Sequence, residues 1–267
     1  MSKVKIITDS CSDLTAEQLD RYGIDYVRMT TVYNGVESMA ELDWSDEDVK
    51  RFYGVMRSGE RITTAQVSVE EFKTVFGKYL SRGDDIVYIG CSSKQSGSVN
   101  TAFVTARGMK EEYPDREIIC IDSLNASMGE GMLAIEAAKA AADGATAREI
   151  EKRILSVRKT VNQFVTVHSL DFLKRAGRVK GAAAFFGNLM GVKPIIISDI
   201  DGEQAAFKKV KGRQTSLKTV VSLLKENIIG AENQTVYLTH ADCDPQEVAA
   251  LVELIRGEIP CADVEVG

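Results

Sequence analysis

The chain has 267 residues, of which 44% are hydrophobic and 27% charged, a composition typical of a globular protein large enough for two domains. Its net charge of −6 and pI near 5.2 argue against a protein whose partner is nucleic acid. No apolar run approaches the roughly 20 residues that cross a bilayer, and the start MSKVKIITDS lacks the apolar core of a signal peptide, so we expect a cytoplasmic protein.

The first 160 residues alternate short β-branched runs with helical stretches, which is the pattern of βα units around a largely parallel sheet. Strands are predicted at Val4–Thr8, Asp85–Gly90 and Glu117–Ile121. Each ends in a polar turn, with the sequences DSCSD, CSSKQSGS and DSLNAS, before a helical segment. Because parallel strands end at a common edge of the sheet, we expect the three turns to lie together.

Two helix starts in this part of the chain carry cap signals. Ser68 with Glu71, and Thr146 with Glu149, have the spacing of a capping box, in which side chain and backbone satisfy each other's hydrogen bonds. Helices are therefore predicted to begin at both positions.

Beyond about residue 160 the pattern becomes that of an α+β domain. A strand is predicted at Phe164–Val167, and the runs PIIIS and QAAFKKV, separated by Asp201-Gly202, predict a β-hairpin. A further strand at Thr235–Thr239 precedes a helix that starts near Pro245 and a short C-terminal strand.

We therefore predict an α/β protein, with an N-terminal, largely parallel α/β/α domain at residues 1–160 and a second, α+β domain at residues 161–267. The second domain contains the stretch AAAFFGNLMGV, residues 182–192, which is apolar around most of its circumference. This stretch is either an ordinary core helix or the wall of a lipid tunnel, where each buried methylene of a ligand contributes about 0.8 kcal/mol.

The sequence offers few residues for catalysis. It has no GxxxxGK[ST] or GxGxxG loop and no GxSxG elbow, and its two histidines, His168 and His240, lie at predicted strand ends. Its five cysteines are Cys11, Cys91, Cys120, Cys243 and Cys261. They are dispersed without CxxC spacing, which suggests neither disulfides nor a zinc site. No cofactor is expected. Cys91 follows a predicted strand, where it is either a nucleophile or a small buried hydrophobe.

Three aspartates, Asp9, Asp13 and Asp122, lie near predicted strand ends. They could bind a metal ion or act as a general base, but they could equally cap the turns that follow the strands. No acidic pair has a spacing that is diagnostic of a metal site.

The loop CSSKQSGSVNTA, residues 91–102, stands between a predicted buried strand and a helix, where ligands bind in open α/β sheets. Ser96, Gly97 and Ser98 could offer hydroxyls and helix N-terminal amides to an anion, with Ser93 as a further candidate, or the loop could be a Ser-rich turn and an ordinary N-cap. Thr64, in the segment TTAQ, could donate a hydroxyl to the same anion, or it could be a surface threonine.

Five segments, taken in order, resemble motifs of the DegV family, which is also called FakB where a fatty acid kinase partner is known. They are ITDSCSDL, TTAQVS, SSKQSGSVNTA, IDSLNASMGEG and HSLDFLKRAGRVKG, and they extend the resemblance over nearly the whole chain.

The resemblance implies a two-domain carrier that holds one long-chain fatty acid in a buried tunnel. Thr64 and Ser96 match the family's carboxylate-binding positions, and Lys211 or Arg213 falls where the family has a basic motif. In that picture the carrier supplies no catalytic residue, and a separate fatty acid kinase phosphorylates the bound carboxyl group for phospholipid synthesis. Peripheral contact with a membrane is compatible with this role.

The chain also departs from the family pattern. Arg28-Met29 stands where the family has Pro-Leu, and Gln95 and Val99 replace a Leu and a Tyr. The sequence ends at Gly267, before a HxGPG-like segment of the family, so no residue is assigned to that segment's histidine. Two other functions stay open, namely a small-molecule transferase or kinase-like enzyme that holds phosphate on the Ser-rich loop, and a non-lipid interaction protein.

Overall fold

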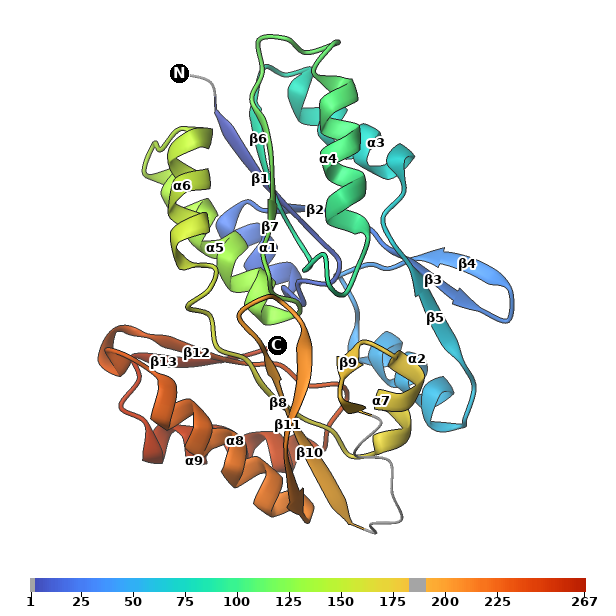
Figure 1. The fold of residues 1–267 in the computed structure, drawn as a ribbon, viewed down its shortest axis with the longest axis vertical. Coiled ribbons are helices and arrows are strands. Elements are labelled where there is room, and N and C mark those ends of the chain that lie inside the picture. Colours follow the sequence, from blue (N-terminus) through green and yellow to red (C-terminus); the bar gives the residue numbers. More distant parts are fainter. Residues whose placement is uncertain (1–2, 183–190) are drawn as a thin grey trace. The chain divides into compact units, whose positions relative to one another are not determined.

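The computed structural model describes residues 3–182 and 191–267. The chain divides into two compact units, Met1–Val161 and Asn162–Gly267, which are described one at a time (Figure 1). Most of the apolar stretch AAAFFGNLMGV, predicted as a core helix or tunnel wall, falls at residues 183–190 and so lies outside the described residues.

A parallel sheet with the strand order β2-β1-β6-β7 forms the centre of the first unit. Its strands are β1 (Val4–Asp9), β2 (Asp25–Val27), β6 (Asp85–Gly90) and β7 (Ile118–Asp122). Every residue of β6 is buried, as expected for a central strand that is covered on both faces. The three predicted strands are confirmed to within one residue, whereas the three-residue β2 is too short to show a pattern in the sequence.

Helices cover both faces of this sheet, which confirms the predicted α/β/α layers (Figure 1). On one face α5 and α6 pack against β1, β6 and β7, and on the other α3 packs against β2 and β6 while α4 packs against β6 and β7. Phe72 of α3 meets the buried ring of Tyr88 edge-on, with 5.2 Å between ring centroids. The helices are α1 (Ala16–Tyr22), α3 (Val69–Leu80), α4 (Ser98–Met109), α5 (Met128–Ala142) and α6 (Ala147–Val157).

A second, antiparallel sheet in this unit is not evident in the sequence. It has the order β4-β3-β5, from β3 (Thr30–Tyr33), β4 (Val36–Met39) and β5 (Ile62–Ala65), and α2 (Asp46–Arg57) lies between β4 and β5 in the chain. None of these elements has a fully buried residue. Without an alternation of buried and exposed positions, the hydrophobic pattern carries no strand signal.

One of the two predicted capping boxes is confirmed. At the start of α6, Thr146 and Glu149 exchange the side-chain and backbone hydrogen bonds of a capping box. At the start of α3, Ser68 accepts the N–H of Glu71 at 3.1 Å, but the carboxylate of Glu71 binds Arg28 instead of the cap. The prediction of a full capping box at Ser68 is therefore wrong. The carboxylate of Glu71 does not accept the N–H of Ser68, because it binds the guanidinium of Arg28 from a distant segment.

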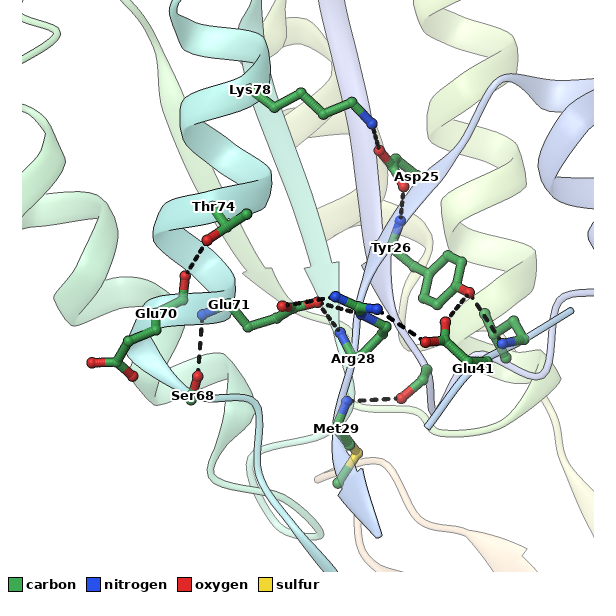
Figure 2. Close-up of polar contacts among 12 residues, drawn as sticks. Asp25, Tyr26, Arg28, Met29, Glu41, Ser68, Glu70, Glu71, Thr74 and Lys78 are labelled. Atoms are coloured by element: carbon green, nitrogen blue, oxygen red, sulfur yellow. Dashed lines mark hydrogen bonds and ion pairs between the residues drawn. The ribbon is translucent and has the colours of Figure 1, made fainter. Parts of the chain in front are cut away.

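Arg28 links three segments of the first unit (Figure 2). Its guanidinium donates to Glu71 through Nε at 2.7 Å and Nη2 at 3.2 Å, and to Glu41 through Nη1 at 2.9 Å. Tyr26 donates its hydroxyl to the other oxygen of Glu41 at 2.9 Å. Residues 26–28 are thereby fastened both to α3 and to the segment that leads into α2.

The second unit has the predicted α+β character. Its main sheet has the order β8-β10-β11-β9, from β8 (Phe164–Thr166), β9 (Val179–Lys180), β10 (Val192–Ser198) and β11 (Gln204–Lys211). β10 and β11 form the predicted antiparallel hairpin. The helices described in this unit are α7 (Leu170–Ala176), α8 (Arg213–Asn227), the 3-10 turn η2 (Ala231–Asn233) and α9 (Pro245–Glu258), and α8 packs on the main sheet. The strands β12 (Thr235–Leu238) and β13 (Asp263–Val266) form a separate parallel pair.

The predicted strand at residues 235–239 and the helix from Pro245 are thus confirmed. Of the helices within the described ranges, none combines the length and the apolar character that crossing a bilayer requires.

Candidate functional site

The three polar turns that follow β1, β6 and β7 lie together, as the sequence predicts. One carboxylate, that of Asp9, accepts the backbone N–H of Cys11 at 2.9 Å and that of Cys91 at 3.1 Å. Ser92 donates its N–H to the carbonyl of Asn125 at 2.8 Å. The loop after β6 is therefore held between the turns of the strands on either side of it.

The loop itself begins as a single helical turn. The N–H of Ser96 bonds the carbonyl of Ser92 at 3.0 Å, and the N–H of Ser93 bonds Oδ1 of Asp122 at 3.3 Å. Gly97 is the N-cap residue of α4 and has no side chain to cap the helix, so the hydroxyl of Ser96 accepts the N–H of Ser98 at 3.2 Å. No serine is the N-cap residue of α4, and the partly buried Ser96 instead contacts Ser98 twice, since its hydroxyl also lies 2.9 Å from the hydroxyl of Ser98.

The segment that follows Thr64 packs against the N-terminus of α4. Gln66 donates its side-chain amide to the hydroxyl of Thr101 at 2.7 Å, and Val67 donates its N–H to the hydroxyl of Ser98 at 3.1 Å. A Cβ atom on Gly97 would lie only 1.8 Å from Oε1 of Gln66, so glycine permits this close approach. Thr64 is exposed on β5, two residues before this contact.

The two cysteines of this region are poor nucleophiles. The hydrogen bond with Cys91, together with burial, raises the pKa of the Cys11 thiol. For Cys91 the same hydrogen bond lowers the pKa, but burial and the neighbouring carboxylates outweigh it, and the net pKa is raised. Because the thiolate is the reactive form, the structure favours the buried, structural role that the sequence left open for Cys91.

The aspartates act as turn caps. Oδ1 of Asp122 accepts the N–H groups of Leu124 and Ser93, at 3.0 and 3.3 Å, and Asp13 accepts the hydroxyl of Ser127. Within residues 3–182 and 191–267, no three His, Cys, Asp or Glu side chains are grouped to hold a metal ion. Turn capping is therefore the role that the described contacts support.

The two basic candidates of the second unit differ in their surroundings. Arg213 forms a bidentate pair with Glu247, at 3.0 and 2.7 Å, and each side chain is 18% exposed. Its Nη1 atom is buried and has no hydrogen-bond partner among the described residues. Lys211 is exposed at the end of β11. Of the two, Arg213 carries the donor that still requires an acceptor.

Hydrogen bonds are described for the ring of His240 and for the backbone carbonyl of His168. His240 accepts the N–H of Cys243 at 3.4 Å, and the carbonyl of His168 accepts the ammonium group of Lys193.

A pocket of about 230 Å³ in the second unit is lined by Arg256 and residues 259–264. It is smaller than the roughly 300–1,000 Å³ of typical ligand pockets, and we do not assign a ligand to it.

A family model described as an uncharacterised protein of the DegV family matches residues 3–267. The chain belongs to the DegV family. A DegV domain-containing protein of Clostridium perfringens is 33% identical over 264 residues, which cover 99% of this chain and 90% of the relative.

Two solved DegV-like structures have the same fold. A DegV lipid-binding protein from Thermotoga maritima matches with a TM-score of 0.86 and 27% identity, covering 99% of this chain and 91% of the other. A protein from Eubacterium ventriosum described as binding stearic acid matches with a TM-score of 0.85 and 25% identity, covering 97% and 87%. The resemblance to the DegV family and the predicted fold class are thereby confirmed.

Two buried groups beneath the Ser-rich loop that follows β6 were not identified from the sequence. Glu130 of α5 and Tyr88 of β6 are fully buried and contact β1 and its turn. The one available signal is a glutamate in the otherwise small and apolar segment MGEGMLA, and helical spacing alone does not say what it faces. Gln66 is likewise missed, because its partner Thr101 lies 35 residues away in the chain.

Proposed function

We propose that this DegV protein is a fatty-acid carrier, which holds an acyl chain in a buried tunnel and presents the carboxyl group to a separate fatty acid kinase. The observation that carries the proposal is the membership of a family whose solved relatives are described as binding lipid and stearic acid. The hydroxyls of Thr64 and Ser96, which match the carboxylate positions of the family pattern, are its proposed headgroup ligands.

The chemistry of these residues suits a carboxyl headgroup. Neutral hydroxyls bind a carboxyl group without burying an unpaired protein charge, and they leave it chemically intact for another protein. The N-terminus of α4, which begins after Gly97, lies on the same loop as Ser96 and favours an anion electrostatically. Of the two basic candidates in the second unit we favour Arg213 over Lys211 as a ligand-binding residue, because its buried Nη1 has no acceptor among the described residues.

The acyl chain supplies most of the affinity in this proposal. At about 0.8 kcal/mol for each buried methylene, a chain of stearic acid's length contributes on the order of 10 kcal/mol before the costs of binding are subtracted. Weak headgroup contacts are then sufficient.

A carrier role also fits the side chains of the loop. With both thiols held protonated by their surroundings, the chemistry is proposed to belong to the kinase, which uses a nucleoside triphosphate. The supply of that cosubstrate is our reason for proposing a cytoplasmic location.

The test is the double variant Thr64→Ala/Ser96→Ala, with stearic acid binding measured by isothermal titration calorimetry. Each lost hydrogen bond costs roughly 1 kcal/mol, so the two together are expected to raise the Kd about 30-fold. Circular dichroism checks that α4 is intact, because Ser96 also bonds the N–H of Ser98.

The matched control is Thr63→Ala, which alters the neighbouring exposed residue on the same strand and is expected to leave the Kd unchanged. Equal affinities of the wild type and the double variant would reject these hydroxyls as the headgroup site. Failure of the wild-type protein to bind stearic acid or any other long-chain fatty acid would reject the function itself.

A further inference from the structure

Two carboxyl groups are buried side by side under the Ser-rich loop. Asp9 ends β1 and Glu130 lies in the first turn of α5, and both side chains are fully buried. The two residues are in direct contact, because the backbone N–H of Asp9 lies 3.5 Å from Oε1 of Glu130. Two adjacent buried carboxylates would repel strongly, so one member of such a pair stays protonated.

Asp9 has the surroundings of the ionised member. Its Oδ1 accepts the N–H of Cys11 at 2.9 Å, and its Oδ2 accepts the hydroxyl of Tyr88 at 2.8 Å and the N–H of Cys91 at 3.1 Å. All three of these neighbours are donors. A carboxylate that receives several donors is stabilised in its charged form.

Glu130 has the surroundings of the protonated member. The hydroxyl of Thr8 lies 2.8 Å from Oε1 of Glu130 and 3.0 Å from the carbonyl oxygen of Ile89, but it has one proton. Both contacts are hydrogen bonds only if Thr8 donates to Ile89 and Glu130 donates to Thr8. Oε2 of Glu130 is buried without a partner among the described residues, which costs less for a neutral acid than for an anion.

The charges around Glu130 also favour its protonated form. The titratable groups that act on it or feel its charge are Asp9, Cys11, Tyr88 and Cys91, and each is negative when ionised. Burial, followed by the charge of Asp9, raises the pKa of Glu130 well above its ordinary value.

We propose that Glu130 is the protonated acid and Asp9 the carboxylate of this pair at neutral pH, and that the pair positions the loop that begins at Cys91 for ligand binding. The chain of contacts is short. Asp9 fixes the N–H of Cys91, and the next residue, Ser92, accepts the N–H of Ser96. Both acids are positioning residues, and the loop's role in binding rests on the proposed function.

The first test needs no ligand and uses Glu130→Gln, whose amide donates and accepts like the protonated acid. Because the folded pKa of Glu130 is raised, its stabilising effect is complete below the unfolded pKa near 4.5 and is lost as pH rises toward the folded pKa. Glutamine does not titrate. The unfolding constant of the wild type relative to the variant is therefore expected to rise about tenfold per pH unit above pH 5.

Urea unfolding followed by the fluorescence of Trp44, the single tryptophan and a residue of the first unit, measures this ratio. Glu136→Gln is the control, since Glu136 is a partly exposed carboxylate of the same helix paired with Arg153, and its ratio should not change between pH 6 and 8. A ratio for Glu130→Gln that stays constant from pH 5 to 8 would overturn the assignment of Glu130 as the protonated acid.

The second test measures the Kd of stearic acid. Glu130→Gln should bind within about twofold of the wild type, whereas Glu130→Leu, which can neither donate nor accept, should bind at least about tenfold more weakly. Thr8→Val replaces the leucine variant if that variant does not fold. Wild-type affinity in the variant that lacks the hydrogen bonds would reject the positioning role. If the wild type binds no fatty acid, the proposed function is rejected. The urea unfolding series at different pH values still tests whether Glu130 is protonated.

Discussion

At the scale of single residues, Asp9 shows how one buried carboxylate organises a loop. Its two oxygens face different elements, with Oδ1 toward its own turn at Cys11 and Oδ2 toward Tyr88 and Cys91 of the neighbouring strand and its turn. Both oxygens are therefore needed. Asp122, which ends β7 as Asp9 ends β1, uses Oδ1 alone for both of its backbone donors.

Asp9→Asn is accordingly expected to lower the free energy of unfolding by at least about 2 kcal/mol, because the amide group would turn N–H toward donors and leave buried groups unsatisfied. Asp122→Asn keeps an oxygen for both of its donors and should cost no more than about 0.5 kcal/mol. Urea unfolding at pH 7 compares the two. Equal losses would contradict the assignment of Asp9 as a two-sided acceptor.

At the scale of elements, the ion pairs of Arg28 fasten the segment between β2 and β3 to α3 (Figure 2). Glu71 is only 7% exposed, whereas the side chain of Arg28 is 36% exposed. The carboxylate thus depends on the arginine for compensation more than the arginine depends on the carboxylate.

Arg28→Met is expected to cost roughly 2 kcal/mol, less than for a fully buried pair because water reaches the arginine. Adding Glu71→Leu should recover about half of that loss, since the stranded carboxylate is then removed. Arg51→Met, which breaks an exposed pair with Asp48, is the control and should change stability by less than about 0.5 kcal/mol. A double variant less stable than Arg28→Met would show that Glu71 does not need the charge of Arg28.

At the scale of the whole molecule, a carrier should be purified with its cargo and be stabilised by it. Native mass spectrometry of the intact protein is expected to show a bound fatty acid, and its removal should lower the Tm. Returning stearic acid at about 100 times its Kd should restore about 2.7 kcal/mol of stability. Cetyl alcohol, with a similar chain and no carboxyl group, is the control for the headgroup. A protein purified empty and unaffected by fatty acid would contradict the carrier role.

The sequence by itself determined the strands β1, β6 and β7, the edge where their turns meet, the capping box at Thr146 and the hairpin of β10 and β11. These features depend on hydrophobic periodicity and on hydrogen bonds between residues a few positions apart, which a single sequence displays. The ordered motifs likewise placed the chain in its family.

Only the tertiary structure decided which distant groups meet. The carboxylate of Glu71 binds Arg28, 43 residues away in the chain, instead of completing the capping box. The side chain of Glu130 contacts the hydroxyl of Thr8, 122 residues away. The small sheet of β3, β4 and β5 also escaped, because none of its residues is fully buried. The physical reason is that burial and long-range hydrogen bonds are set by packing between separate elements, which no local pattern encodes.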